Sequence, residues 1–139
     1  MKPPKQVIIM RKDLNMRRGK QIAQGSHASM KALLHGMEKI YHEGFGDKGI
    51  LFSYTLTDRV ESTMGKWLEG AFTKICVGVD SEAELDAIVT KARNEGMLCS
   101  VIIDNGTTEF NGIPTKTCAC IGPWDSDEID KITGHLKLL

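Results

Sequence analysis

The 139-residue sequence has no hydrophobic run near the roughly 20 residues that a membrane-spanning helix needs. Its first apolar run, residues 7–10, is too short for the core of a signal peptide. It also has no internal repeat, no low-complexity segment and no net charge. These absences argue against a membrane partner and predict a cytoplasmic protein with one domain over residues 1–139.

Cysteines are few and lack the spacing of a metal site. The four occur at positions 76, 99, 118 and 120, in apolar and β-branched surroundings. A free cysteine in such surroundings behaves as a small hydrophobic side chain. Cys118-x-Cys120 has no second pair at zinc-finger distance. We therefore expect neither a metal site nor a structural disulfide.

The common signatures of catalysis and nucleotide binding are missing as well. The sequence contains no nucleophile elbow, phosphate-binding P-loop, dinucleotide fingerprint or His-Glu-x-x-His. A covalent serine mechanism has no obvious base beside its serine. The residues present permit hydrolysis by an activated water at a polarised carbonyl, with no cofactor.

Charge is absent overall but unevenly distributed. Residues 1–31 hold eight Lys or Arg and one acid, Asp13, whereas the rest of the chain holds ten bases and seventeen acids. A basic N-terminal third predicts an anionic partner, with nucleic acid as the obvious candidate. A solvated basic surface would explain the same pattern equally well.

Hydrophobic periodicity predicts strands at residues 6–11, 73–79, 98–103 and 116–121, separated by helices. This order predicts an α/β fold of three layers, with some strands parallel. Ser81 and Glu84 form a capping box, and Asp125-Ser126 caps a last helix. We expect Gly122-Pro123 to end the preceding strand.

The region between the first helix and the second main strand contains an irregular, glycine-rich segment. The first helix carries Met30, Leu33, Leu34 and Met37 at the spacing of a core-facing stripe. Residues 41–55 are punctuated by glycines and predict an excursion with at most a short strand at 50–54. Thr57 or Asp58 then caps a helix whose apolar face is Val60, Met64, Trp67 and Leu68.

The strongest candidate site lies where the first helix begins. Lys20 and Gln24 are four residues apart and share one helix face. The first turn of a helix favours an anion, so a lysine there opposes the local electrostatic preference, as functional sites often do. The competing interpretation is an ordinary surface lysine. His27, among small residues, is more simply a satisfied core histidine than a catalyst.

A second polar cluster, residues 104–109, follows the third main strand. Asp104 could orient a lysine or a water, and the threonine hydroxyls could donate to a developing oxyanion. An Asx turn that caps the strand would also explain Asp-Asn-Gly. Thr115 and Thr117, at the start of the next strand, are unspecific by themselves.

Several of these segments resemble the type 2 peptidyl-tRNA hydrolase family, in the same order along about nine-tenths of the chain. The resemblance covers residues 10–28, 67–77, 80–85, 104–108, 121–123 and 130–139. It implies a mixed four-stranded sheet flanked by helices, commonly in a homodimer. It also implies an enzyme that cleaves the ester between a peptide and tRNA, so that the tRNA is recycled.

By position, the resemblance assigns Lys20, Asp104 and Thr108 as catalytic, with Gln24 and Thr117 in support. Asp104, polarised by Lys20, would position a water, and Lys20 and Thr108 would stabilise the oxyanion. A nearby lysine should lower the pKa of Asp104 and make it a weak base. We expect tRNA phosphates to contact four basic residues: Arg11, Lys12, Arg17 and Arg18.

Three departures separate this chain from the family it resembles. The segment at residues 41–55 is an insertion, and the loop before Thr115 is one residue longer. Thr107 and Glu109 replace a common Arg and Gln. Thr107 and Glu109 motivate an alternative, a tRNA- or protein-binding module without hydrolytic activity. An esterase acting on D-aminoacyl-tRNA is a further possibility from sequence.

Overall fold

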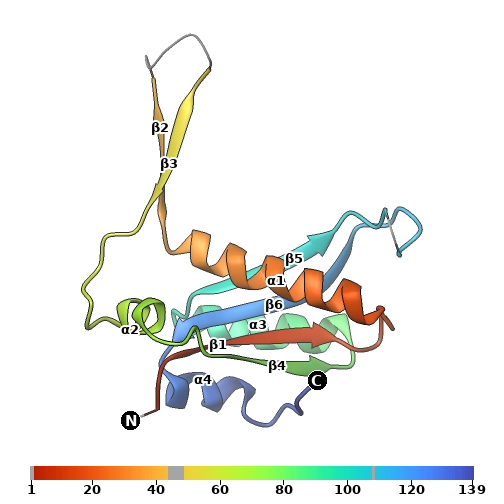
Figure 1. Ribbon diagram of the computed structural model, residues 1–139. Coiled ribbons are helices and arrows are strands. Elements are labelled where there is room, and N and C mark those ends of the chain that lie inside the picture. Colours follow the sequence, from red (N-terminus) through yellow and green to blue (C-terminus); the bar gives the residue numbers. More distant parts are fainter. Residues whose placement is uncertain (1, 44–48, 108) are drawn as a thin grey trace.

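A computed structural model describes residues 2–43, 49–107 and 109–139 (Figure 1). Within them a mixed sheet is sandwiched between helices, which confirms the predicted three-layer α/β fold. The elements in chain order are β1 (Lys5–Arg11), α1 (Arg18–His35), β2 (Glu38–His42), β3 (Leu51–Thr55), α2 (Thr63–Glu69), β4 (Lys74–Val79), α3 (Glu82–Asn94), β5 (Cys99–Asp104), β6 (Thr115–Trp124) and α4 (Ser126–Thr133).

The four-stranded sheet has the order β4-β1-β6-β5. Strand β1 pairs in parallel with β4, whereas β6 pairs antiparallel with both β1 and β5. Successive side chains of β1 point to opposite faces: Val7 and Ile9 pack toward α3 and α4, and Ile8 and Met10 toward α1. A continuous apolar run is therefore needed at this central strand, which is covered on both faces.

Helix α1 packs on the sheet through its smallest residues, which corrects our prediction for its buried face. The buried positions are Gln24, Gly25, Ala28 and Ala32, whereas Met30 is 59% exposed. Small side chains let the helix axis approach the sheet closely, so Met30 is left in solvent while Leu33, Leu34 and Met37 are half-buried. The helix ends at His35, before Met37.

The excursion expected at residues 41–55 is a two-stranded hairpin that begins earlier, at Glu38. Strands β2 and β3 pair antiparallel, so the prediction of at most one short strand was wrong. Figure 1 shows the hairpin leaving the body at the C-terminal end of α1. Residues 44–48, which include Gly44 and Gly46 of the predicted excursion, lie outside the described residues.

Two predicted boundaries also need correction. Helix α2 is capped by Ser62, whose hydroxyl accepts from the Gly65 N–H at 2.9 Å, and not by Thr57 or Asp58. Strand β6 runs through Gly122-Pro123 to Trp124 instead of ending there. A β-bulge in its pairing with β1 accommodates the proline, because a bulge leaves a position that donates no ladder hydrogen bond.

The predicted caps of the last two helices are confirmed. Ser81 accepts from the Glu84 N–H at 3.0 Å and Asp125 accepts from the Glu128 N–H at 3.0 Å. The core-facing residues of α3 are all buried: Leu85, Ile88, Val89 and Ala92. Across the described part of the chain, no helix is long and apolar enough to cross a membrane.

Candidate active site

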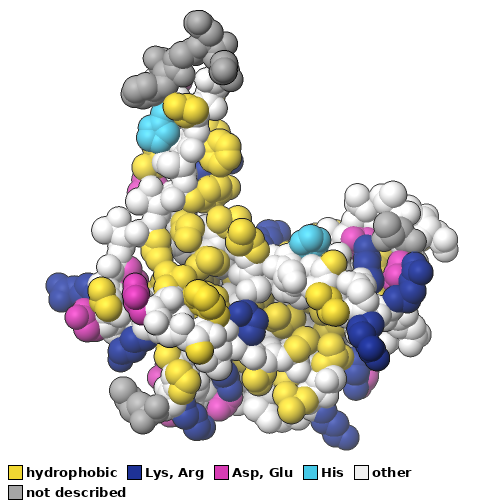
Figure 2. Space-filling view, viewed as in Figure 1, with side chains coloured by type: hydrophobic (Ala, Val, Ile, Leu, Met, Phe, Trp, Pro, Cys, Tyr) yellow, Lys and Arg dark blue, Asp and Glu magenta, His cyan; other side chains and the backbone are white. Residues whose placement is uncertain are grey.

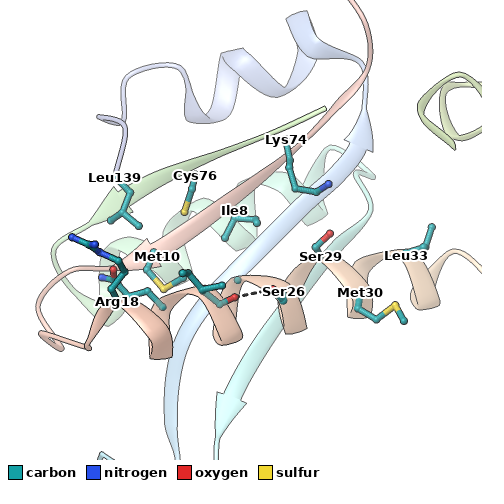
Figure 3. Close-up of a pocket in the computed structure, with 13 residues that line it drawn as sticks. Ile8, Met10, Arg18, Ser26, Ser29, Met30, Leu33, Lys74, Cys76 and Leu139 are labelled. Atoms are coloured by element: carbon teal, nitrogen blue, oxygen red, sulfur yellow. Dashed lines mark hydrogen bonds between the residues drawn. The ribbon is translucent and has the colours of Figure 1, made fainter. Parts of the chain in front are cut away.

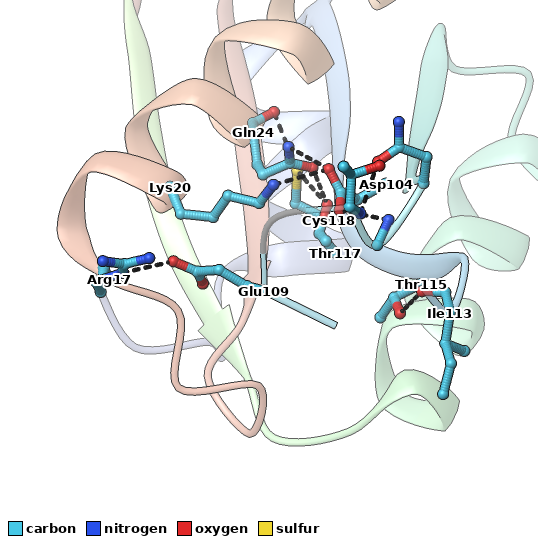
Figure 4. Close-up of polar contacts among 12 residues, drawn as sticks. Arg17, Lys20, Gln24, Asp104, Glu109, Ile113, Thr115, Thr117 and Cys118 are labelled. Carbon is cyan, nitrogen blue, oxygen red and sulfur yellow. Dashed lines mark hydrogen bonds and ion pairs between the residues drawn. The ribbon is translucent and has the colours of Figure 1, made fainter. Parts of the chain in front are cut away.

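The site forms where the start of α1 meets the C-terminal end of β5. Lys20 Nζ donates to Asp104 Oδ1 at 2.9 Å, and the two side chains are only 15% and 11% exposed (Figure 4). These residues are far apart in sequence and meet because α1 crosses the face of β5 and β6. The structure thus brings together two of the three residues that were expected to be catalytic. The third, Thr108, lies outside the described residues.

Gln24 extends the pair into the protein interior. Its Nε2 donates to Asp104 Oδ1 at 3.2 Å, and its Oε1 accepts from the Thr117 hydroxyl at 2.6 Å. Gln24 and Thr117 are buried, so the only arrangement that satisfies both ends directs the amide nitrogen at the carboxylate. The two supporting residues from sequence therefore form one chain of hydrogen bonds to Asp104.

The loop after β5 holds the second oxygen of Asp104. The Gly106 N–H donates to Oδ2 at 2.9 Å, and the Gly106 carbonyl accepts from the Gly112 N–H at 2.8 Å. Gly106 has a φ of +82°, and a Cβ there would lie 2.4 Å from the carbonyl oxygen of Ile113. Only glycine fits this turn, which also has the Asx geometry of the competing interpretation. The Asx turn after β5 therefore also holds the Asp104 carboxylate of the site in place.

These contacts decide the charge of Asp104. The hydrogen bond from Lys20 is the largest cause that lowers its pKa, and the Gly106 N–H, the charge of Lys20 and the Gln24 amide lower it further. Desolvation acts in the opposite direction and is outweighed. Asp104 is therefore a carboxylate at neutral pH, which confirms the expected direction of the shift and makes it a weak base.

The loop is tied to α1 by two residues that the sequence did not single out as useful. Glu109 Oε1 accepts from Arg17 Nε at 2.8 Å, and the Phe110 ring centroid lies 5.9 Å from Lys20 Nζ. Arg17 is 83% exposed, whereas Glu109 is mostly covered. From the sequence, Glu109 was identified only as a departure from the residue common in the family. Its opposite charge to nearby Arg17 was the signal that could have identified the contact.

The basic residues proposed for phosphate binding differ in how accessible they are. The Arg11 guanidinium is only 11% exposed, pairs with Asp13 at 2.6 Å and donates to the Lys116 carbonyl. Lys12 is extended over Gly78 and reaches Asp80 at 3.3 Å. Arg17 and Arg18 stand exposed at the start of α1. All four flank the end of the sheet at which Lys20 and Asp104 meet.

Other candidate residues lie away from the site or are unsuited to its chemistry. His27 is exposed on α1, so its interpretation as a core histidine was wrong. The cysteines are free, and burial raises the pKa of Cys118 to about 12. In the described ranges, no group of three or more His, Cys, Asp or Glu could hold a metal ion. The Thr115 hydroxyl donates to the Ile113 carbonyl at 2.8 Å.

A separate apolar groove of about 860 Å³ runs along the other side of α1. Figure 3 shows it between α1 and strands β1 and β4, with Ile8, Met10 and Cys76 at its base. Ile22 and Leu139 also line it and are 64% and 49% exposed. The groove contains neither Lys20 nor Asp104, so it is a surface distinct from the polar site.

The site can therefore orient a water on a carboxylate beside a fixed ammonium group. Hydrogen bonds from the described residues account for two acceptor positions on Asp104 Oδ1 and one on Oδ2. A carboxylate has about four such positions, so Oδ2 has room for one more donor. An ammonium at this distance stabilises negative charge that develops on a neighbouring carbonyl oxygen. This is chemistry for hydrolysis of an activated ester.

Comparison with known proteins also points to ester hydrolysis. The family model described as "Peptidyl-tRNA hydrolase PTH2" matches residues 4–139. A peptidyl-tRNA hydrolase of Methanocaldococcus jannaschii is 39% identical over 135 residues, covering 97% of this chain and 99% of the relative. One of Metallosphaera sedula is 37% identical over 135 residues, with the same coverage. A solved protein of unknown function from Agrobacterium tumefaciens has a TM-score of 0.54 at 13% identity, covering 100% of this chain and 99% of its own, and shows the fold alone.

Proposed function

This chain belongs to the peptidyl-tRNA hydrolase PTH2 family, and from that membership we propose that it hydrolyses peptidyl-tRNA at the Lys20–Asp104 pair. The substrate is the ester between a peptide, or an N-blocked amino acid, and the tRNA ribose. The observation that carries the assignment is the 2.9 Å contact between Lys20 and Asp104 at the edge of the sheet. The family and the full-length relatives named as hydrolases do not favour a binding module without activity.

In the proposed mechanism Asp104 orients the attacking water through the remaining position on Oδ2. Because its pKa is lowered, Asp104 accelerates the reaction mainly by placing the water and only weakly by removing its proton. The Lys20 ammonium stabilises the oxyanion as the water adds to the ester carbonyl. We propose that Thr108 is a second hydrogen-bond donor to that oxyanion. The proton lost by the water finally resides on the departing ribose oxygen.

Gln24 and Thr117 act on the substrate through Asp104 in this proposal. The Thr117 hydroxyl fixes the Gln24 amide, and the amide holds the carboxylate in one rotamer. Both are positioning residues because they are buried beneath the pair. Their loss should reduce kcat more than it changes KM, since a misplaced carboxylate affects the reacting geometry.

We propose that tRNA phosphates contact Lys12, Arg17 and Arg18, with Arg11 in a supporting role. Arg11 is held by Asp13, so its charge contributes to the local field while its guanidinium stays in the protein. Phosphate contacts release counterions and make affinity fall with salt. The proposal therefore includes a tRNA affinity that decreases steeply between low and physiological salt.

The enzyme is proposed to act in the cytoplasm as a homodimer, with the apolar groove beside α1 as the contact between copies. Exposed Ile22, Met30 and Leu139 border this groove, and burial of such a patch favours association. Replacing Met30 by Glu should convert the dimer into monomers in sedimentation experiments. An unchanged sedimentation coefficient would place the contact elsewhere.

The deciding experiment follows the release of the acyl group from N-acetyl-aminoacyl-tRNA. Lys20→Ala should lower kcat by about a hundredfold to a thousandfold, the usual effect of losing one donor to an oxyanion. Lys31→Ala is the matched control, because Lys31 is a lysine of the same helix whose ammonium donates to the Val101 carbonyl and, among the described residues, forms no ion pair. Normal release by Lys20→Ala would overturn the assignment of the site.

A further inference from the structure

One face of the β2–β3 hairpin carries three aromatic rings around a lysine. The pairing places Lys39 opposite Tyr54 and Tyr41 opposite Phe52, and residues directly opposite point to the same side of a sheet. Lys39 Nζ lies 4.8, 5.3 and 5.6 Å from the ring centroids of Tyr41, Phe52 and Tyr54. We call Lys39, Tyr41, Phe52 and Tyr54 the aromatic face.

The aromatic face is open to solvent. Tyr41 is 62% exposed and Phe52 is 60% exposed, although large rings are normally buried. In Figure 2 hydrophobic side chains gather along the hairpin and continue onto the body below it. An exposed patch of this kind marks an interaction surface, because it gains free energy only when another molecule covers it.

Its composition favours RNA over protein as the occupant. The cores of protein–protein interfaces are depleted of lysine, whereas here a lysine sits at the centre of the rings. Surfaces that bind unpaired nucleotides combine both features, since rings stack on bases and cations attract phosphates. The chain also has an RNA substrate under the proposed function, so such a partner is present during each reaction.

The aromatic face stands far from the reacting ester. Lys20 lies in the first turn of α1, and β2 begins just after the last turn. Eighteen helical residues span about 27 Å, and a five-residue strand adds about 17 Å in another direction. Figure 1 shows the hairpin and the loop between β5 and β6 at opposite ends of α1. The separation is on the order of 30 Å.

We propose that the aromatic face stacks on exposed bases in the folded body of the tRNA, while the acyl end lies at Lys20 and Asp104. The inference rests on the proposed function, because that function supplies the RNA. Binding at two points this far apart fixes the direction of the tRNA along α1. It also lets the enzyme discriminate between complete tRNA and shorter RNAs that carry the same ester.

The test compares two substrates and measures kcat and KM for each. One is a full-length N-acetyl-aminoacyl-tRNA, and the other is an RNA hairpin with only the acceptor stem and the same acylated end. The double variant Tyr41→Leu/Phe52→Leu retains apolar bulk but removes two rings. We expect KM for the complete tRNA to rise at least about fivefold, the lower limit for one lost stacking partner. We expect kcat, and both constants for the short RNA, to stay unchanged.

Two further variants make the result specific. Ile40→Ala alters the opposite face of the hairpin, since Ile40 pairs with Ser53, and should leave KM for both substrates unchanged. Lys39→Gln removes the charge between the rings and should reduce the salt dependence of binding to complete tRNA by about one phosphate contact.

Several outcomes would overturn the inference. These are an unchanged KM for complete tRNA in the double variant, or an equal rise for both substrates. A change in sedimentation caused by the same substitutions would instead make the aromatic face a contact between copies. Failure of the wild-type protein to release any acyl group would contradict the proposed function. Equilibrium binding of uncharged tRNA by the same variants would then still test the aromatic face.

Discussion

Two buried glutamines, Gln24 on α1 and Gln6 on β1, end in different surroundings. Gln24 links Thr117 to Asp104, whose carboxylate pairs with Lys20. Gln6 is as completely buried, but its amide donates to the carbonyls of Ser29 and Gly122 at 3.2 and 3.3 Å and accepts from the Ser29 hydroxyl. The Gln6 cluster is neutral, whereas the Gln24 cluster ends in the charged pair of Lys20 and Asp104.

The comparison shows why burial of a polar side chain does not identify a catalytic site. Both amides satisfy the requirement that buried donors and acceptors be paired. Only the Gln24 cluster also has a carboxylate whose pKa is lowered and an ammonium group beside it. We therefore expect changes in the Gln24 cluster to affect catalysis and changes in the Gln6 cluster to affect stability.

The largest effect should come from Asp104→Asn. This variant has nearly the same shape but cannot orient a water as a carboxylate does, so kcat should fall by about a hundredfold to a thousandfold. The melting temperature should also fall, but only modestly, because the variant loses one ion pair with Lys20 at the edge of the sheet. Assay of acyl release beside a thermal melt checks both statements. Retained activity would show that the charged end of the cluster is not the catalytic end.

Gln6→Leu should have the reverse effect. It leaves the carbonyls of Ser29 and Gly122 and the Ser29 hydroxyl without their partner, at a cost of about 1–3 kcal/mol in the free energy of unfolding. Urea denaturation measures this loss, and kcat at a temperature where the protein is folded should be unchanged. A fall in kcat would mean that both clusters support the reaction, which would contradict the assignment of the Gln6 cluster to stability alone.

Thr117→Val sharpens the contrast at the level of one hydroxyl. Without the Thr117 donor the Gln24 amide is no longer held toward Asp104, so we expect a roughly tenfold lower kcat with KM nearly unchanged. Ser29→Ala is the matched control, because it removes the hydroxyl that donates to the Gln6 amide. This control should lower the melting temperature but leave kcat intact. Equal kcat in the two variants would contradict a role for the hydrogen bonds from Thr117 through Gln24 to Asp104 in catalysis.

The two clusters should also differ in their response to pH. The pKa of Asp104 is lower in the folded protein, so its stabilising contribution is present above the unfolded value of about 3.9 and is lost as pH falls through the folded pKa. The unfolding free-energy difference between wild type and Asp104→Asn should therefore shrink in strong acid. The difference for Gln6→Leu should stay constant. In Lys20→Ala, the acid limb of kcat/KM should move to higher pH.

The smallest expected effect concerns the loop that only the Gln24 cluster has. In the free enzyme the Glu109 carboxylate forms an ion pair with the Arg17 guanidinium, and a tRNA phosphate would compete for that guanidinium. Glu109→Gln should therefore lower KM for tRNA by a few-fold and increase the salt dependence of binding, with kcat almost unchanged. A higher KM would indicate that the ion pair instead holds the loop in the binding geometry.

Local signals in the sequence predicted most elements but not the helix–sheet packing or the hairpin. The Ser81 and Asp125 caps were found because the hydrogen bonds of a cap involve near neighbours. Met30 was assigned to the core by its spacing, yet the sheet accepts Ala28 and Ala32 instead. The hairpin was missed because its strands lie on either side of a glycine-rich segment and pair across it.

The sequence by itself determined the kinds of element, their order and the residue types available for chemistry, because periodicity and caps act over a few residues. It also carried the family resemblance and the candidate pair. Only the tertiary structure decided that Lys20 meets Asp104 across 84 residues and that Thr117 orients Gln24 across 93. Such contacts depend on how α1 lies over β5 and β6. That placement is set by close packing of the whole sheet rather than by any local pattern.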